Sequence, residues 1–366
     1  MRKAAALLIG GMMILATGCN KEMDMTAPQK TTAAQTQAAA QSQEGADSQA
    51  ADGKEGELKL PDSYDLIMTF GAETSSTYSM GIQIGEYFNE IAPQIRSTVK
   101  TGAAGSNIEL ADAGQTVISH TQSDLIYAAL EGTDSFTEKK ENFRGVATVM
   151  ESVFHLAVAK EAPVNTLDEI IEQKYPLKIS VGAQGSGIEN LFRKILGSYD
   201  VTYEDIESWG GRIEFLSMSE AATLFKDDQL NAVTILAGVP YSGITEVATS
   251  RDIKFIEIPA HIIESMSDVG YMKKDIPAGS YKGQDTDVAS LGVTISVIAS
   301  ADADEAVIYE ITKFLNSEEG IQKLADVNAG YASYMKGPET GVAGIGVELH
   351  PGAKRYYEEA GVVKGQ

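Results

Sequence analysis

The 366-residue chain contains only one cysteine, Cys19, so it cannot form an internal disulfide bond. It has no cysteine pair, no His-Glu-x-x-His motif and no calcium-loop spacing, which argues against the common metal sites. Lysine and arginine number 29 against 52 aspartates and glutamates, and the resulting net charge of −23 repels phosphate backbones. We therefore expect no metal, no cofactor and no nucleic-acid partner.

Long hydrophobic runs are also absent, apart from a short one at the N-terminus. Arg2 and Lys3 precede an apolar stretch that is too short for a membrane span and is typical of a signal peptide. Small residues lead directly into Cys19, an arrangement that resembles the lipobox of bacterial lipoproteins. We expect a signal peptide over residues 1–18 and an extracytoplasmic protein anchored to the bacterial membrane by diacylated Cys19. The alternative is an ordinary cleaved signal peptide followed by a chance cysteine.

Residues 19–57 have almost no side chains that could form a core. They are mainly Ala, Thr, Gln, Ser, Gly and acidic residues. Such a composition cannot offset the entropy cost of ordering, so we expect a disordered tether. A flexible chain of this length spans roughly 35 Å, which would hold a folded body close to a membrane.

From Leu58 onward, short apolar runs alternate with helical patterns, and the alternation restarts near Pro176. This order is typical of an α/β architecture with mainly parallel sheets, and the restart indicates a second sheet in a second domain. The run 143–160 contains two apolar stretches, as buried strands would. A helix is expected over 80–92, with a buried face formed by Ile82, Ile84, Tyr87, Phe88 and Ile91.

The segment Ser180–Asn190 joins an apolar run to a helical pattern through a glycine-rich turn. Helix starts of this kind present free N–H donors to anions. A P-loop needs a lysine after Gly187, and a dinucleotide fingerprint needs a third glycine where Asn190 stands, so both are disfavoured. Ser186 lacks the flanking pattern of a nucleophile elbow. A carboxylate site and a plain strand-to-helix turn stay open.

Four further strand-end loops are rich in Gly, Ser, Thr and Gln: Gly71–Gly81, Thr101–Glu109, His120–Asp124 and Leu236–Gly243. In open α/β sheets, ligands bind at the carboxyl ends of the strands. We therefore interpret the five loops, which come from both halves of the chain, as the walls of one site for a small polar ligand.

Over Leu60–Gly361 the sequence resembles the TAXI-type solute receptors of TRAP transporters. The motifs that carry the resemblance are GAETSSTYSMG, TGAAGSNIELADAGQ, the segment Thr121–Ala128, FRGVATV, SVGAQGSGIEN, LAGVPYSGI, DIPAGSYKG and LHPGAKRYYEEAG. The last two are distinctive, because no general structural cause for them is evident in the sequence.

This resemblance implies a type II periplasmic-binding-protein fold, with two α/β lobes joined by a hinge and a ligand in the interlobe cleft. It implies a monomeric, non-catalytic receptor that delivers a glutamate- or 2-oxoglutarate-like carboxylate or amino acid to a TRAP permease. The expected first lobe comprises residues 58–158 and 285–366, and the second comprises 159–284. The implied ligand contacts are Ser76, Thr77, Tyr78, Ser106, Asn107, Gln122, Ser123, Ser186, Gly187 and Pro240.

The chain departs from the family at the first loop, where Ser79 follows Thr77 and Tyr78 and a second aromatic residue is missing. Ligand identity is therefore open. Three other functions also remain: the binding protein of an ABC-type importer of organic anions, a secreted α/β hydrolase with Ser186 as its nucleophile, and a sensor that signals to a membrane kinase.

Overall fold

The computed structural model describes residues 58–364, so the predicted signal peptide, Cys19 and the whole of the predicted tether lie outside the described residues. The described residues form one compact unit. Within the described part, no helix combines the length and the hydrophobicity that a membrane span requires.

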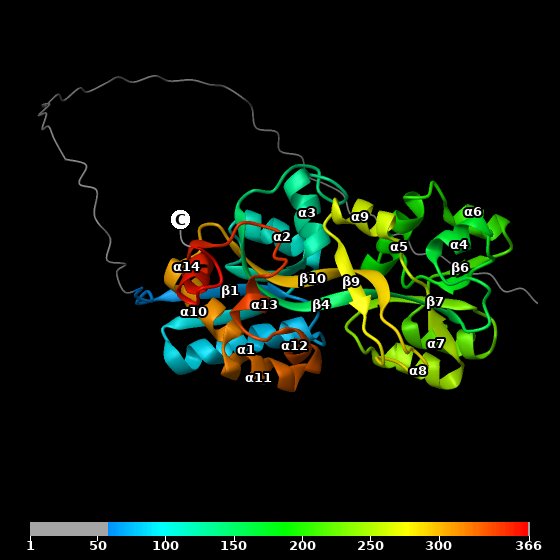
Figure 1. Cartoon of the computed structure of the whole chain (residues 1–366). Helices are drawn as coiled ribbons and strands as arrows, with labels where there is room; N and C mark the ends of the chain where they lie inside the picture. Colours follow the sequence, from blue (N-terminus) through cyan, green and yellow to red (C-terminus); the bar gives the residue numbers. More distant parts are fainter. Residues whose placement is uncertain (1–57, 365–366) are drawn as a thin grey trace, which may run out of the picture. The chain divides into compact units, whose positions relative to one another are not determined.

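Strands and helices alternate along most of the chain (Figure 1). The first elements are β1 (Tyr64–Phe70), α1 (Ser76–Ile91), β2 (Ile95–Thr101), α2 (Ala104–Asp112), β3 (Ile118–Gln122), α3 (Ser123–Glu131) and β4 (Phe143–Ala159). The next are α4 (Leu167–Glu172), β5 (Lys178–Ser180), α5 (Gly187–Gly197), α6 (Tyr203–Ser208), β6 (Arg212–Glu214), α7 (Met218–Lys226), β7 (Ala232–Ala237), α8 (Ser242–Ser250), β8 (Ile253–Phe255) and α9 (Ala260–Ser267). The chain ends with β9 (Met272–Ile276), β10 (Val288–Ser300), α10 (Glu305–Asn316), α11 (Glu318–Val327), α12 (Ala329–Tyr334), α13 (Pro338–Val342) and α14 (Pro351–Glu359).

The described strands form one continuous sheet in the order β2-β1-β3-β10-β4-β7-β5-β6, with β8 beside β4 and β9 beside β10. The pairs β1–β2, β1–β3, β5–β6 and β5–β7 are parallel. Strands β4 and β10 are antiparallel to every partner they have in this sheet. The expectation of mainly parallel, separate sheets is therefore wrong at the centre of the molecule, where two long strands join the parallel halves.

Strand β4 connects the two halves. It is a single strand of 17 residues, and not the two strands that its two apolar stretches suggest. Its first part pairs with β10 up to Val153, and from Val153 onward it pairs with β7. We call lobe 1 the part built on β1–β3 and lobe 2 the part built on β5–β7, each with its own helices (Figure 1). The predicted two-lobed α/β fold of the type II periplasmic-binding-protein kind is confirmed, while the exact lobe boundaries stay a prediction.

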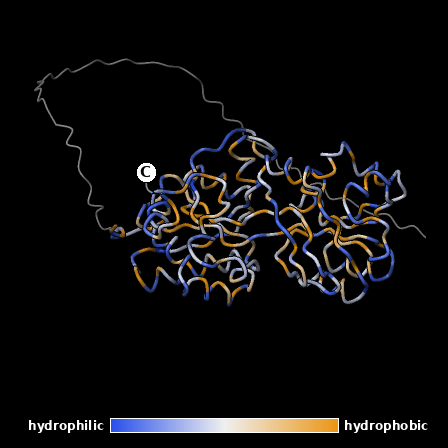
Figure 2. The backbone as a smooth tube through the Cα atoms, viewed as in Figure 1, coloured by the Kyte–Doolittle hydropathy of each residue, from blue (hydrophilic) through white to orange (hydrophobic). Residues whose placement is uncertain are grey.

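Hydrophobic residues gather along the inner strands and the helix faces that cover them (Figure 2). On α1, Ile84 and Phe88 are fully buried as expected, and half-buried Tyr87 stacks on Phe314 with ring centroids 4.6 Å apart. Ile82 and Ile91 are 40% and 46% exposed, so the predicted face is too wide. Ile82 lies two residues from Ile84 and thus on the opposite side of the helix, and Ile91 is the last helical residue.

The C-terminal LHPGAKRYYEEAG motif has a structural cause. The side chain of His350 caps α14 by accepting a hydrogen bond from the backbone N–H of Gly352 (3.2 Å), and Pro351 takes the first helical position. A Cβ atom at Gly352 would lie only 2.2 Å from the backbone oxygen of Glu305 in α10. The buried hydroxyl of Tyr357 donates to the Val146 oxygen of β4 (3.1 Å). The motif therefore fixes α14 against α10 and β4.

The capping histidine predicts a pH dependence of stability. Burial lowers the pKa of His350 to about 4, from its usual 6.5. Between these pH values the unfolded chain binds a proton that the native state excludes, so the free energy of unfolding falls as pH decreases, by up to about 1.4 kcal/mol per pH unit. Asparagine also caps helices but does not titrate. We expect His350→Asn to lose less stability than the wild type on going from neutral pH to about pH 5.

Urea unfolding of both proteins at the two pH values measures this difference. Burial lowers the pKa of His120 and His155 to about 4 as well, so the variant should keep part of the pH dependence. If His350→Asn loses as much stability between the two pH values as the wild type does, then protonation of His350 does not contribute to the pH dependence of stability.

Candidate functional site

A cavity of about 920 Å³ is lined by the N-terminal ends of three helices. We call it the helix-start cavity. Helices α2 and α3 follow strands of lobe 1, whereas α5 follows β5 of lobe 2, so both lobes contribute walls. The lining residues are Ala103, Ala104, Gly105, Gln122, Asp124, Leu125, Asp134, Ser135, Gly185, Gly187, Asn190, Arg193, Lys194 and Tyr271.

The local sequence explains why helices begin here. After β5, Gly182 and Gly185 have φ angles of 82° and 74°, a region that other residues rarely adopt. Ser186 then caps α5 by accepting from the N–H of Glu189 (3.5 Å). Gln122 is the first residue before α3, and its side chain does not cap that helix. The first N–H groups of a helix have no intrahelical acceptor and carry a partial positive charge, so this cavity suits an anionic group.

Charged side chains line the same cavity. Asp124 accepts a hydrogen bond from the Tyr271 hydroxyl at Oδ2 (3.0 Å), while its buried Oδ1 has no hydrogen-bond partner. Burial raises the pKa of this carboxyl, and the hydrogen bond from Tyr271 opposes the shift. The Lys194 ammonium lies 2.7 Å from Oδ2 of Asp134.

Arg193 is paired as well. Its guanidinium lies 2.7 Å from Oε1 of Glu189, whose side chain is almost fully buried, and 4.2 Å from the centre of the Tyr203 ring. Both cations that line the helix-start cavity therefore already have a carboxylate partner.

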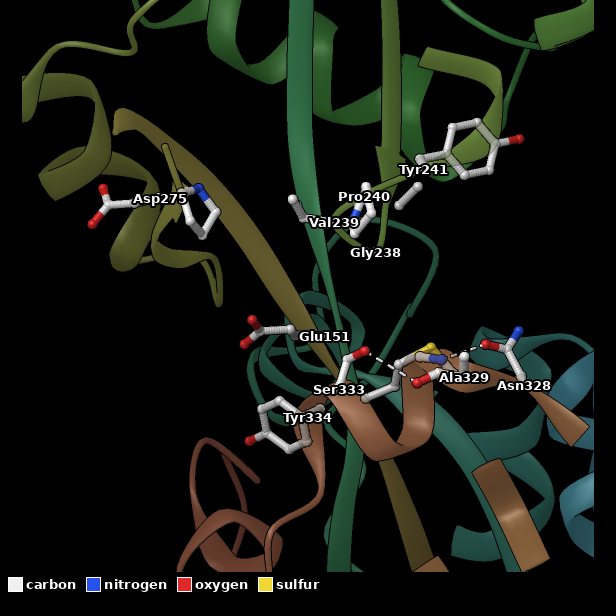
Figure 3. Close-up of a pocket in the computed structure, with 14 residues that line it drawn as sticks. Glu151, Gly238, Val239, Pro240, Tyr241, Asp275, Asn328, Ala329, Ser333 and Tyr334 are labelled. Carbon is white, nitrogen blue, oxygen red and sulfur yellow. Dashed lines mark hydrogen bonds between the residues drawn. The ribbon is translucent and has the colours of Figure 1, made fainter. Parts of the chain in front are cut away.

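A second cavity, of about 610 Å³, lies between β4, β9, the turn 238–241 and α12. We call it the β4–α12 cavity. Pro240 and Tyr241 form one wall, and Ser333 and Tyr334 lie on the opposite wall (Figure 3). The polar groups of the α12 wall are used internally, since Ser333 donates to the Ala329 oxygen (3.1 Å). Glu151 is paired with Lys274.

The turn 238–241 is bound by Tyr281, whose hydroxyl in turn contacts the buried side chain of His155. Tyr281, from the DIPAGSYKG motif, accepts the N–H of Tyr241 at its hydroxyl (2.8 Å) and lies 2.9 Å from Nε2 of His155. Nδ1 of His155 is 2.8 Å from the Val153 oxygen. Burial lowers the pKa of His155 to about 4, so the neutral ring donates from Nδ1 and accepts the Tyr281 proton at Nε2. This second distinctive motif therefore also has a structural role.

The predicted contact residues divide into three groups. Gln122 and Gly187 line the helix-start cavity, and Pro240 lines the β4–α12 cavity. A methyl group on Gly187 would lie 3.9 Å from Oε1 of Gln122, so these two residues of different lobes face each other. The residues of the second group are next to lining residues, but their hydroxyls already form hydrogen bonds inside the protein. Ser106 bonds to the backbone of Ala103, Ser123 accepts from the N–H of Thr294, and Ser186 accepts from the N–H of Glu189.

The third group, Ser76, Thr77, Tyr78 and Asn107, lines neither cavity. Asn107 is fully buried, and its amide nitrogen donates to the backbone oxygen of His120 (2.9 Å) and lies 3.1 Å from Nδ1 of that ring. The geometry favours a supporting role for Asn107 between α2 and β3, because its donors are used inside lobe 1.

Several lining residues were missed by sequence reasoning: Asp124, Arg193, Lys194 and Tyr271. Asp124 ends the TQSD segment and could have been included with Gln122. Arg193 and Lys194 follow Asn190 by three and four residues, which places them one helical turn further along α5. Tyr271 precedes β9, and no local pattern connects it to Asp124.

Ser186 is used as a helix cap in this structure. In residues 58–364, no histidine is hydrogen bonded to the Ser186 hydroxyl, which serves as a helix cap. Within the same range, no group of three or more His, Cys, Asp and Glu side chains is placed to hold a metal ion.

A model of the NMT1-like family matches residues 68–361 of the chain. Among solved structures, the chain is similar to XAC2383 from Xanthomonas citri bound to chloride ion, with 10% identity over 81% of this chain and 97% of that chain, at a TM-score of 0.46. It is also similar to an ABC-type phosphate transport receptor from Vibrio cholerae (15% identity, 72% and 98% covered, TM-score 0.43). A third is the periplasmic aliphatic sulphonate binding protein SsuA from Escherichia coli (14% identity, 75% and 79% covered, TM-score 0.42).

Proposed function

Since this chain belongs to the NMT1-like family, we propose that it is an extracytoplasmic solute receptor, which binds a small carboxylate or amino acid and catalyses no reaction. The observation that supports this function most strongly is the meeting of three helix N-termini, from two lobes, in one cavity. The first N–H groups of a helix have no intrahelical acceptor, and together with the aligned dipoles they can stabilise a carboxylate without a reacting side chain.

The size and position of the helix-start cavity support the same function. Its volume of about 920 Å³ is within the range of small-molecule sites. Its walls belong to both lobes, so a ligand that contacts both would favour the conformation in which they are close together. A receptor that releases its ligand to a membrane protein needs such a reversible closure.

We propose a TRAP permease as the partner, on the strength of the TAXI-like motifs, and membrane attachment through diacylated Cys19. An ABC-type importer is the alternative partner. Uptake into vesicles that contain the candidate permease separates the two, because a TRAP permease requires an ion gradient and an ABC-type importer requires ATP.

A thermal-shift screen followed by calorimetry tests the receptor function. The panel contains amino acids, oxo acids, dicarboxylates, inorganic phosphate and an aliphatic sulfonate. A true ligand at 100 times its dissociation constant adds about 2.7 kcal/mol of stability, which should raise Tm by about 5 °C. We expect such a shift from at least one carboxylate. The function is wrong if no carboxylate in the panel binds, whether or not phosphate or the sulfonate does.

A further inference from the structure

We propose that Lys194 and Asp134 form a latch between the two lobes, which holds the helix-start cavity closed and slows the release of its ligand. The effect on release rests on the receptor function proposed above, whereas the latch itself can be measured without a ligand. Both residues act as positioning residues, because their charges are used to hold the walls of the cavity together.

The two members of this ion pair are carried by different lobes, since α3 belongs to lobe 1 and α5 to lobe 2 (Figure 1). Lys194 lies on α5, where its neighbours Phe192 and Ile195 are fully buried. Asp134 lies in the loop after α3, and Phe136 of that loop is buried in a cluster with residues of α2 and α3. Both residues line the helix-start cavity, where Nζ of Lys194 lies 2.7 Å from Oδ2 of Asp134. The pair therefore joins two walls that can move relative to each other.

A second contact joins the same two walls. Tyr271 lies in the segment 159–284 that is predicted for the second lobe, and its hydroxyl donates to Oδ2 of Asp124 at the start of α3 (3.0 Å). The centre of its ring is 5.7 Å from Nζ of Lys194. A Cβ atom at Gly270 would lie only 2.7 Å from Cα of Asp124, so the backbone before Tyr271 packs directly on α3. Lys194 therefore reaches Asp134 beside a place where the lobes already touch.

The position of the pair decides what it can do. An ion pair within one lobe stays together when the lobes move, so it contributes only to folding. An ion pair between lobes exists only in the closed arrangement and shifts the population toward it. The side chains of Lys194 and Asp134 are 31% and 45% exposed, and a pair this accessible to water favours the closed arrangement by about threefold. A ligand that can leave only after opening is then released more slowly.

Three variants test the latch: Lys194→Glu, Asp134→Lys and the double variant that carries both changes. Each single change replaces an attraction by a repulsion, so we expect ligand release to become about 10-fold faster. The double variant exchanges the two charges and restores the attraction, and its release rate should stay within about threefold of the wild-type rate. Stopped-flow dissociation of L-glutamate, or of the panel carboxylate that binds most tightly, measures these rates. The differences should shrink at about 1 M salt, where the Debye length falls to about 3 Å.

The direction of the changes separates a latch from direct contact with the ligand. A carboxylate that interacts directly with these charges would leave Lys194→Glu faster and Asp134→Lys more slowly, because the two changes add charge of opposite sign to the cavity. A latch makes both releases faster. Asp134→Asn repeats the test without reversing a charge, since asparagine also tolerates the φ angle of 56° at this position. We expect it to release the ligand about threefold faster.

Lys139→Glu is the matched control. Lys139 is paired with Glu131 (3.1 Å), and both residues belong to lobe 1, at the end of α3 and in the loop that follows it. The same charge reversal here breaks an ion pair within one lobe and should leave the release rate unchanged. Thermal unfolding of each variant shows whether it is folded.

The distance between the lobes is a readout that needs no ligand. Spin labels on Thr137→Cys in lobe 1 and Glu207→Cys in lobe 2, two exposed positions, report this distance in a full chain that also carries Cys19→Ser. We expect Lys194→Glu and Asp134→Lys to populate longer distances than the labelled parent protein. The double variant should return to the shorter distance.

The outcomes separate the latch from the proposed function. The latch is overturned if the two single variants change ligand release in opposite directions, or if the folded double variant releases the ligand as fast as they do. Equal lobe distances in all the labelled proteins overturn it as well. If no carboxylate binds, the receptor function fails, and the distances alone then decide whether the latch exists.

Discussion

Gly187→Asp is expected to lower ligand affinity by about 100-fold, which corresponds to about 2.7 kcal/mol, while the protein stays folded. Gly187 is the first residue of α5 and lines the helix-start cavity opposite Gln122. An aspartate there would place a carboxylate at the helix N-terminus, where the dipole attracts it. That carboxylate would compete with the ligand carboxylate for the N–H donors and repel it.

The same substitution at the other end of the helix provides the control. Gly197 is the last residue of α5, is exposed, and would have nothing within 4 Å of an added Cβ. Gly197→Asp adds the same charge to the same helix far from its N-terminus and should retain wild-type affinity. Calorimetry with the ligand found in the screen measures both variants. Retained affinity in Gly187→Asp would show that the ligand binds elsewhere, the β4–α12 cavity being the next candidate.

Gly352→Ala is expected to destabilise the protein by about 3 kcal/mol, a cost at the upper end of that for overpacking a well-filled interior. An added Cβ would lie 2.2 Å from the Glu305 oxygen and 2.8 Å from the Tyr309 nitrogen. Both are backbone atoms of α10, so the clash cannot be relieved by rotating a side chain. The helices α10 and α14 would have to separate.

Gly197→Ala is the matched control for this second prediction. It is also a glycine-to-alanine change in a helix, but in open space. It should stabilise the protein by about 0.5–1 kcal/mol through helix propensity. Urea unfolding measures both free energies. Equal stabilities of the two variants would contradict the close packing of α14 on α10, and a loss of ligand affinity in folded Gly352→Ala would contradict the purely structural role of the C-terminal motif.

Much of the fold and part of the site could be predicted because the signals are local. Apolar runs of strand length alternate with helical patterns, and this order indicates an α/β protein whose restart near Pro176 suggests a second domain. The two-lobed arrangement is implied by the family resemblance. Sequence reasoning places Gln122 and Gly187 in strand-end loops of one expected site, because strand ends in such sheets meet at a common edge. Both residues line the helix-start cavity, and their contact with a ligand stays a prediction.

Other features depend on residues that are far apart in the chain. Asp124 and Tyr271 are 147 residues apart, yet their side chains form one hydrogen bond in the wall of the cavity. Tyr281 and His155 are 126 residues apart, and their contact gives the DIPAGSYKG motif a structural role that its local sequence does not indicate. The role of His350 and Gly352 likewise became visible only with α10 beside them.

The sequence by itself determined the alternating elements, the polar loops at the strand ends and the absence of disulfides, because each depends on neighbouring residues or on composition. Only the tertiary structure decided that β4 is one strand shared by both lobes, since its pairing partners β10 and β7 come from distant segments. It also decided which charges meet in the helix-start cavity. Pairing between charges depends on distances in space, and those distances are set by how the lobes pack and not by spacing along the chain.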